Sequence, residues 1–174
     1  MDCLETRPYV CYKNYDDEES MGDCGIMDDA YFFSNRTGSC YKFHTIPRSY
    51  SRAVMACAAE GGYLAIINSK AEAKIIASSF FHNLPSQMSN LCPEDEAYMG
   101  FSDWNEHGEW LTFHGESLHK AGYSKWYSGE PNNHDMEYCG GVDSSGLLIS
   151  LNCDIPHYFI CEKDPESLLC DEEK

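Results

Sequence analysis

The chain has 174 residues, of which 12 are Lys or Arg and 29 are Asp or Glu, so its formal charge is -17. This length suits one well-buried domain with some additional chain. Because the charge repels phosphate backbones and anionic lipids, we expect no nucleic-acid partner. No apolar run, the strand-sized Leu64–Ile67 among them, approaches the roughly 18 residues that a membrane-spanning helix needs, so we expect no membrane span.

The chain contains ten cysteines, an even and high number, and none of them forms a C-x-x-C pair. This pattern disfavours zinc ribbons and thioredoxin-like redox sites, and it favours structural disulfides made in an oxidising compartment. We therefore expect a secreted, extracellular protein. The triplet Asn35-Arg36-Thr37 is a glycosylation acceptor that fits this location. Met1 is followed by Asp-Cys rather than by a signal peptide, so either the chain is a mature segment or the true start lies upstream.

The first half of the chain predicts two helices with a short strand between them. Apolar residues repeat at helical spacing from Arg48 to Glu60, and two glycines then provide a stop. The apolar run 64–67 predicts a strand. Ser69 and Glu72 form a capping box ahead of a second apolar stripe that continues to Phe80. Residues 83–96, rich in Pro, Asn and Ser, predict a loop.

The second half predicts short strands separated by polar, Gly-rich segments. The expected strands cover residues 97–101, 109–113, 125–127, 138–142, 147–151 and 158–162. Helices followed by many short strands indicate an α+β fold. We interpret the three tryptophans, Trp104, Trp110 and Trp126, as core aromatics rather than as a platform for sugar stacking.

The segment 128–136 has no apolar periodicity but is rich in side-chain oxygens. Glu130, Asn132, Asn133 and Asp135 surround Pro131. A hard cation such as Ca2+ prefers several oxygen ligands on an irregular loop. Two interpretations remain open from composition alone, a Ca2+-binding loop and a plain acidic loop.

Several motifs, in the correct order, resemble a C-type lectin domain over about residues 24–163. They are Cys40-Tyr41-Lys42-Phe43, the helix with Cys57, Gly62 to Ser69, Tyr98-Met99-Gly100-Phe101, Glu130-Pro131-Asn132, Glu137-Tyr138-Cys139 and Tyr158 to Glu162. The resemblance implies a disulfide-stapled α+β fold with two helices, short antiparallel sheets and a long irregular binding loop. Residues 37–44, 56–62 and 114–123 are more narrowly similar to the immulectin-type lectins of insect haemolymph, which typically carry two such domains in tandem.

An internal repeat agrees with a tandem arrangement. Residues 2–13 match residues 152–163 in cysteine spacing and in the aromatic, aliphatic and Cys ending. We therefore interpret residues 1–13 as the end of a preceding lectin domain, 14–23 as an acidic linker, 24–163 as the C-type lectin domain and 164–174 as an acidic tail. An upstream lectin domain of the same chain is one expected partner.

The resemblance also implies cysteine pairs, which the cysteine count alone leaves open. It pairs Cys57 with Cys161, Cys139 with Cys153, and Cys24 with Cys40. The remaining assignments are guesses that join Cys92 to Cys170 and Cys3 to Cys11.

In this family a Glu-Pro-Asn loop, a later Glu and an Asn-Asp pair hold Ca2+, and the ion and its ligands bind sugar hydroxyls. Glu130, Pro131, Asn132 and Glu137 match this pattern, which goes with mannose-type sugars and a cis proline. The Asn-Asp positions, however, hold Ile149 and Ser150. The resemblance therefore implies a Ca2+ ion that is bound weakly or not at all, with Glu130, Asn132, Glu137 and Ser150 as its ligands.

A second, structural Ca2+ site of some relatives is expected to be absent. Asp103 matches one of its ligands, but His107, Asn133 and Tyr138 occupy positions where carboxylates are expected.

The expected function is recognition of microbial surface glycans, such as lipopolysaccharide or mannan, by a secreted lectin of innate immunity. The alternative is a lectin-fold module that binds a protein or a lipid headgroup without Ca2+. The sequence contains no G-x-S-x-G or H-E-x-x-H motif, so we expect no enzyme.

Overall fold

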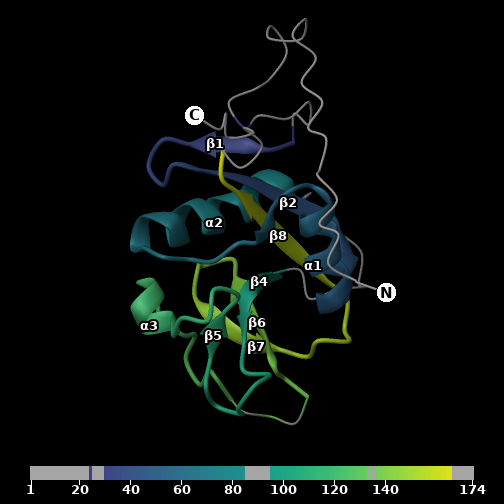
Figure 1. Cartoon of the computed structure of the whole chain (residues 1–174), viewed down its shortest axis with the longest axis vertical. Coiled ribbons are helices and arrows are strands. Elements are labelled where there is room, and N and C mark those ends of the chain that lie inside the picture. Colours follow the sequence, from purple (N-terminus) through teal and green to yellow (C-terminus); the bar gives the residue numbers. More distant parts are fainter. Residues whose placement is uncertain (1–23, 25–29, 85–94, 133, 135, 166–174) are drawn as a thin grey trace, which may run out of the picture.

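The computed structural model describes residues 24, 30–84, 95–132, 134 and 136–165. Within this part of the chain, helices and strands alternate irregularly (Figure 1). In chain order they are β1 (Phe32–Ser34), β2 (Ser39–Arg48), α1 (Tyr50–Ala59), β3 (Tyr63–Leu64), α2 (Lys70–Asn83), β4 (Glu96–Ser102), β5 (Leu111–Thr112), α3 (Leu118–Ala121), β6 (Cys139–Asp143), β7 (Leu148–Leu151) and β8 (His157–Lys163).

The strands form one connected sheet in the order β1-β2-β8-β4-β6-β7, with β3 attached to β8 and β5 attached to β4. All of these pairs are antiparallel except that of β4 with β8, which is parallel and places Ala97 opposite Tyr158. Strand β8 therefore connects β1, β2 and β3 on one side of the sheet to β4, β6 and β7 on the other.

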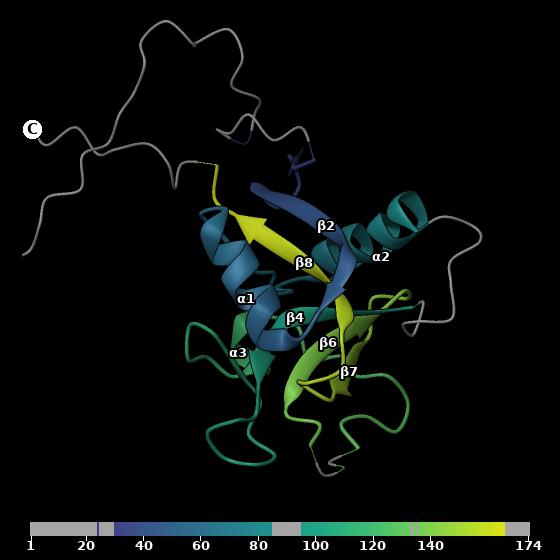
Figure 2. The same ribbon diagram turned by 90° about the vertical axis from the view of Figure 1, so that its right-hand side faces the viewer.

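The two longer helices lie on opposite sides of β8 (Figure 2). One core cluster joins α2 to Phe43 of β2 and to Tyr158 and Ile160 of β8. The other joins α1 to Phe159 and Cys161 of β8. Because successive side chains of a strand point to opposite faces, the alternation along β8 supplies both cores, and all seven of its residues are buried.

The start of α2 confirms the predicted capping box in part. The Ser69 side chain accepts a hydrogen bond from the Glu72 backbone N–H at 3.1 Å. The Glu72 carboxylate accepts from the Asn68 backbone N–H rather than from that of Ser69, and it also accepts from the hydroxyl of Tyr41. Burial raises the pKa of Glu72, which is fully buried. This carboxylate ties the start of α2 to the central strands.

Three disulfides staple the described part of the chain, and they are the pairs that the family resemblance implies. Cys24 is bonded to Cys40, Cys57 to Cys161, and Cys139 to Cys153. The second bridge links α1 to β8 across 104 residues of sequence. Cys3, Cys11, Cys92 and Cys170 lie outside the described residues.

The structure confirms the α+β class and the C-type lectin fold, with local corrections. The strand expected at 64–67 ends at Leu64, and no strand covers residues 125–127, where only Trp126 forms a bridge with Leu148. The first helix begins at Tyr50 because Arg48 is still paired with His157 in β2. Neither β1 nor the single turn of α3 was predicted from the sequence.

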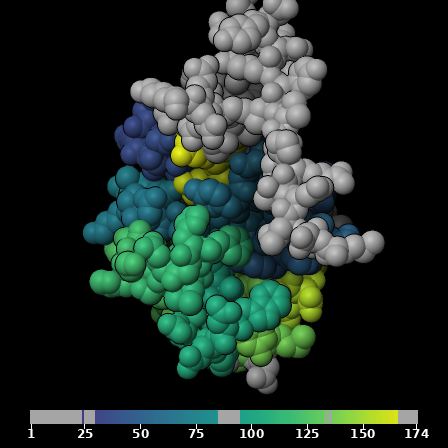
Figure 3. All heavy atoms as spheres, in the orientation of Figure 1, coloured from purple at the N-terminus to yellow at the C-terminus, as the bar shows by residue number. Residues whose placement is uncertain are grey.

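The expectation for Trp104 was wrong, because this side chain is 64% exposed. Trp110 is buried, and Trp126 is partly buried against Trp110 and Phe101. Gly140 permits this aromatic packing, since a Cβ at that position would lie 2.3 Å from the Phe101 ring. Figure 3 shows the green part of the chain, which includes α3, covering the lower front of the molecule.

No helix in the described ranges is long and apolar enough to cross a membrane. The expected domain remnant at 1–13, the linker at 14–23 and nearly all of the tail at 164–174 lie outside the described residues.

The bridge between Cys57 and Cys161 yields a stability prediction. Replacing both cysteines with Ser should lower the free energy of unfolding by about 2–5 kcal/mol, since the bridge closes a very long loop and so restricts the unfolded chain. Urea denaturation of the purified protein measures this change. Unaltered stability of the double variant would contradict the structural importance of this bridge.

Candidate functional site

A cleft of about 370 Å³ opens between the segment that follows α3 and the strands β4, β7 and β8. Four of the five expected sugar-binding residues, Glu130, Asn132, Glu137 and Ser150, line it. The other lining residues are Glu96, Tyr127, Ile149, Leu151, Asn152, Ile155 and His157. The fifth expected residue, Pro131, follows Glu130 through a cis peptide bond, as the resemblance implies.

Glu130 is held by hydrogen bonds from the protein itself. Its Oε2 accepts from the Ser150 backbone N–H at 2.9 Å and from the Ser150 hydroxyl at 2.5 Å. Its Oε1 accepts from the Asn132 side-chain amide at 2.8 Å. The loop is therefore ordered around Glu130 by neutral donors.

Glu137 approaches the same hydroxyl, with 3.3 Å between its Oε2 and Ser150 Oγ. The hydroxyl carries a single proton, so it can donate to only one of the two carboxylates at a time. The Asn132 Oδ1 accepts from the His134 backbone N–H at 3.0 Å. Two carboxylates and one hydroxyl thus lie within reach of one another, and the amide nitrogen of Asn132 bonds to one of the carboxylates.

This donor set fits a hard cation such as Ca2+ in type, because each of its residues carries a side-chain oxygen. The set has fewer oxygen ligands and less negative charge than the family pattern. Ile149 offers no side-chain oxygen, and Ser150 is neutral where the family has a carboxylate. Ile149 is only 7% exposed and packs in the core cluster that contains α1, so an apolar side chain suits this position.

Two strands and a disulfide position these residues. In the β6–β7 ladder, Cys139 lies opposite Leu151 and Gly140 opposite Ser150. The bond between Cys139 and Cys153 closes the end of this ladder. Ser150 is consequently presented at a fixed place beside the loop that carries Glu130.

Tyr127 forms one wall of the cleft and remains half exposed. Its backbone N–H donates to the Leu148 carbonyl at 2.8 Å, and the Leu148 N–H donates to the Lys125 carbonyl at 2.8 Å. These two bonds fix the segment beside β7. Ile155 is also half exposed at the cleft, and its carbonyl oxygen lies 2.6 Å from the hydroxyl of Tyr98. Neither wall residue was predicted from the sequence.

Glu96 and His157 line the cleft as neighbours on adjacent strands. Each is the first residue of its strand, and the parallel pairing of β4 with β8 places them side by side. His157 Nδ1 lies 3.6 Å from Glu96 Oε2 and has no hydrogen-bond partner among the described residues. The sequence contained no signal for this pair, because nothing in its pattern reveals a parallel register.

Burial sets the protonation of this pair. It lowers the pKa of His157 to about 4, so the ring is neutral at neutral pH and the contact with Glu96 is no ion pair. Burial also raises the pKa of Glu96, and the nearby carboxylates of Glu130, Asp95, Glu137 and Asp143 raise it further. The cleft therefore concentrates negative charge.

The described residues at the expected positions of the second Ca2+ site contact one another. Asp103 is 1% exposed, and its Oδ2 accepts from the Gly108 backbone N–H at 2.9 Å. His107 Nδ1 lies 2.9 Å from the same oxygen, and its ring packs edge-on against Tyr138. Asn133 lies outside the described residues.

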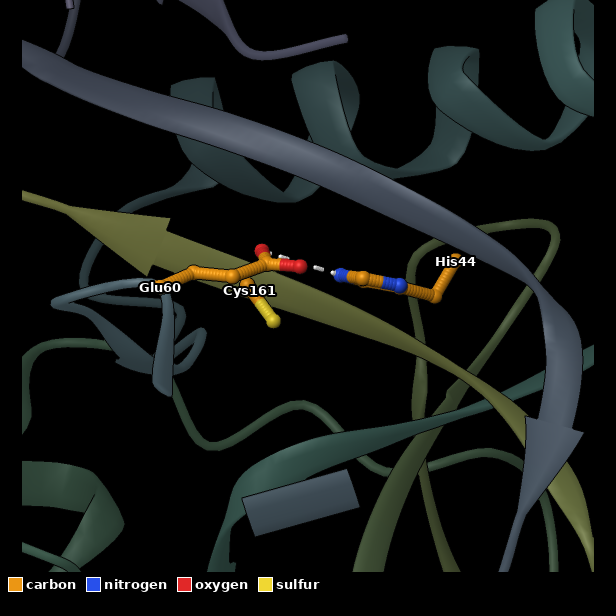
Figure 4. A group of neighbouring side chains, drawn as sticks. All are labelled: His44, Glu60 and Cys161. Carbon is orange, nitrogen blue, oxygen red and sulfur yellow. Dashed lines mark hydrogen bonds and ion pairs between the residues drawn. The ribbon is translucent and has the colours of Figure 1, made fainter. Parts of the chain in front are cut away.

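His44, Glu60 and Cys161 form a further cluster with metal-ligand chemistry (Figure 4). The sulfur of Cys161 is bonded to Cys57, so it is not available as a thiolate ligand. Glu60 instead accepts a hydrogen bond from Tyr31 and pairs with Lys42 at 3.0 Å. We interpret this cluster as structural.

Asn35, the expected glycosylation site, is exposed in the turn between β1 and β2. Its position leaves the side chain accessible to modifying enzymes.

Comparison with known proteins agrees with this architecture. The family profile described as "Lectin C-type domain" matches residues 46–163, and the chain belongs to the C-type lectin domain family, which is a family of carbohydrate-binding proteins. The relatives and the fold are those of lectins, which are binding proteins rather than enzymes. C-type lectins generally depend on Ca2+.

Individual relatives come from insects and vertebrates. The chain is 32% identical over 124 residues to a hemolymph lipopolysaccharide-binding protein of Periplaneta americana, which covers 70% of this chain and 48% of that protein. It is 34% identical over 149 residues to C-type lectin domain family 4 member M of Hylobates lar, covering 86% of this chain and 34% of the relative. The chain thus spans about half or less of the length of these relatives.

Among solved structures, the carbohydrate-recognition domain of the human scavenger receptor C-type lectin superposes with a TM-score of 0.64 at 25% identity. The match covers 79% of this chain and 98% of that domain.

The buried His157 predicts a pH dependence. The pKa of His157 in the folded protein, about 4, is below the ordinary value of 6.5. The stability contributed by its neutral form is therefore fully present above about pH 6.5 and is lost as the pH falls towards 4. Between about pH 7.5 and 4.5, wild type should lose about 2–3 kcal/mol of stability relative to His157→Gln. Urea denaturation at both pH values measures this difference.

The comparison with the variant is needed because carboxylates with raised pKa values, such as Glu96 and Glu72, change stability in the opposite direction. A His82→Gln variant, at an exposed position of α2, is the matched control and should follow wild type. Parallel pH profiles for wild type and His157→Gln would contradict the prediction.

Proposed function

We propose that the chain is a secreted pattern-recognition lectin that binds mannose-type sugars of microbial surface polysaccharides at the cleft, with the help of a weakly held Ca2+ ion. The observation that carries the proposal is the convergence of Glu130, Asn132, Glu137 and Ser150 around one position. The proposal takes residues 24–163 as the binding domain and residues 1–13 as the end of a preceding lectin domain.

The roles of the residues follow from their donors and acceptors. Adjacent sugar hydroxyls each need an acceptor for their proton and a donor for their oxygen. Glu130 offers an acceptor and the amide of Asn132 offers a donor, and they already lie 2.8 Å apart. Glu137 adds a second acceptor. A bound Ca2+ ion would supply a positive charge between the carboxylates and the sugar oxygens.

The identity of the polysaccharide is inferred from a relative. The name of the Periplaneta americana protein states that it occurs in hemolymph and binds lipopolysaccharide. We infer the same extracellular setting and the same ligand class, with mannan as a second test ligand. The role in innate immunity and the modification of Asn35 belong to this proposal.

The proposal predicts retention on mannan-agarose in the presence of Ca2+. Glu130→Ala and Asn132→Ala should each reduce retention at least about tenfold, because each removes a direct hydrogen-bond partner and a cation ligand. Glu109→Ala, at an exposed position outside the cleft, should behave as wild type. If both cleft variants are retained like wild type, the site is not the cleft.

The weak Ca2+ site yields a gain-of-function prediction. In Ser150→Asp, a third carboxylate replaces the hydroxyl that now hydrogen-bonds to Glu130, so repulsion should lower the melting temperature without Ca2+. Millimolar Ca2+ should restore it, and mannan retention should rise with Ca2+ concentration. The paired variant Ile149→Asn with Ser150→Asp should bind Ca2+ more tightly still.

Ser150→Asn, which is neutral, is the matched control for repulsion and should show a smaller response to Ca2+. Calorimetric titration with Ca2+ compares the variants. Tight Ca2+ binding by wild type that neither Asp-containing variant alters would show that the ion is held elsewhere.

One observation favours the alternative function, binding without Ca2+. The Glu130 loop is already ordered by hydrogen bonds from Ser150 and Asn132. A module preorganised in this way can bind a protein or lipid headgroup with no ion. Retention on mannan-agarose that a chelator leaves unchanged, or that is absent while another ligand binds, would support this alternative.

A further inference from the structure

We propose that the cleft has a second subsite, at Glu96, Glu137 and His157, that binds the primary ammonium group of an amino sugar. This inference rests on the proposed function, because it assumes that the same cleft receives a glycan. It adds a ligand class, polysaccharides with free amino groups, to the mannose-type sugars.

The charge of the cleft is the first argument. Three of its lining residues, Glu96, Glu130 and Glu137, are carboxylates, and no Lys or Arg is among the residues that line it. The one residue that could balance them, His157, is neutral at physiological pH because burial lowers its pKa to about 4. The described cleft therefore lacks the positive charge that its carboxylates favour.

Unequal hydrogen bonding among the carboxylates is the second argument. Glu130 accepts three hydrogen bonds from Ser150 and Asn132. Glu137 has one long contact, 3.3 Å from the hydroxyl of Ser150, and Glu96 has its 3.6 Å approach to His157. Glu96 and Glu137 thus keep acceptor capacity for a ligand. An ammonium group has three N–H donors and no acceptor, which matches this surplus.

His157 is the third and independent argument. Its side chain is 3% exposed and its Nδ1 has no hydrogen-bond partner among the described residues, although it lines the cleft beside Glu96. Unpartnered buried polar atoms are rare, because leaving one unsatisfied costs stability. A polar group bound at Glu96, or a water molecule bound with that group, would give His157 Nδ1 the hydrogen-bond partner that it lacks.

The walls of the cleft favour an amine carried on a sugar ring. Tyr127 and Ile155 are half exposed and present apolar surface beside the carboxylates, which suits the C–H faces of a pyranose. A phosphoethanolamine group would bring its own phosphate against three carboxylates and would be repelled. An N-acetylated sugar has no charge to offer and leaves Glu96 unpaired.

Ca2+ and the ammonium group would compete, since both use Glu137. Removing Ca2+ should therefore strengthen binding of the amino sugar while it weakens binding of mannan. This opposite response separates the two ligand classes in one protein.

The test is calorimetry of the full chain with a tetramer of glucosamine and with its fully N-acetylated counterpart, in chelator at about pH 6, where a primary amine is protonated. We expect at least about tenfold tighter binding of the free amine. Glu96→Gln should abolish most of that preference, while Glu109→Gln, which removes one exposed charge outside the cleft, should keep it. O-phosphoethanolamine should bind no better than the acetylated tetramer.

Equal binding of the two tetramers by wild type would overturn the inference, as would an unchanged preference in a folded Glu96→Gln. The wild-type comparison and its response to added Ca2+ need no variant, so they test the inference even if Glu96→Gln fails to fold. Ca2+-dependent mannan retention without an amine preference would overturn this inference alone. An amine preference without any mannan retention would overturn the mannose assignment and leave the subsite standing.

Discussion

Strand β8 is the constraint on which the rest of the structure depends. It hydrogen-bonds to β2, β3 and β4, and all seven of its residues are buried. Its alternating side chains supply both cores, its Cys161 bonds to α1, and its first residue, His157, lines the cleft. A strand with partners on both edges and helices on both faces cannot shift its register without exposing one core. The geometry of the cleft is therefore fixed by the core.

The cleft is ordered by hydrogen bonds among its own residues. Where the family places a carboxylate, Ser150 donates two hydrogen bonds to Glu130, one from the backbone and one from the hydroxyl. A neutral donor stabilises a carboxylate in place, whereas a further carboxylate would need a cation to offset repulsion. Ile149, at the neighbouring position, contributes to packing instead of coordination. Glu137 and Glu96, by contrast, have only long contacts within the described part of the chain.

The helices and most of the strands were predictable because their signals are local, whereas the C-type lectin fold and the disulfide pairs were predicted from the family resemblance. The apolar stripes gave α1 and α2, Ser69 and Glu72 marked the start of α2, and short β-branched or aromatic runs marked most strands. The Glu-Pro-Asn motif located one side of the cleft through family resemblance. The rest depends on pairing between distant segments. Glu96 and His157 meet only through a parallel register, and Trp104 differs from the other two tryptophans in tertiary packing alone.

The direction of β8 also separates the two ends of the domain. His157 begins the strand at the cleft, and Lys163 ends it opposite Cys40, whose disulfide partner is Cys24. The described chain therefore enters and leaves at one end, about 20 Å from the cleft by the rise of an extended strand. In the proposed tandem arrangement, two such clefts on one chain would engage one repeating polysaccharide together, and their combined avidity would exceed the affinity of each.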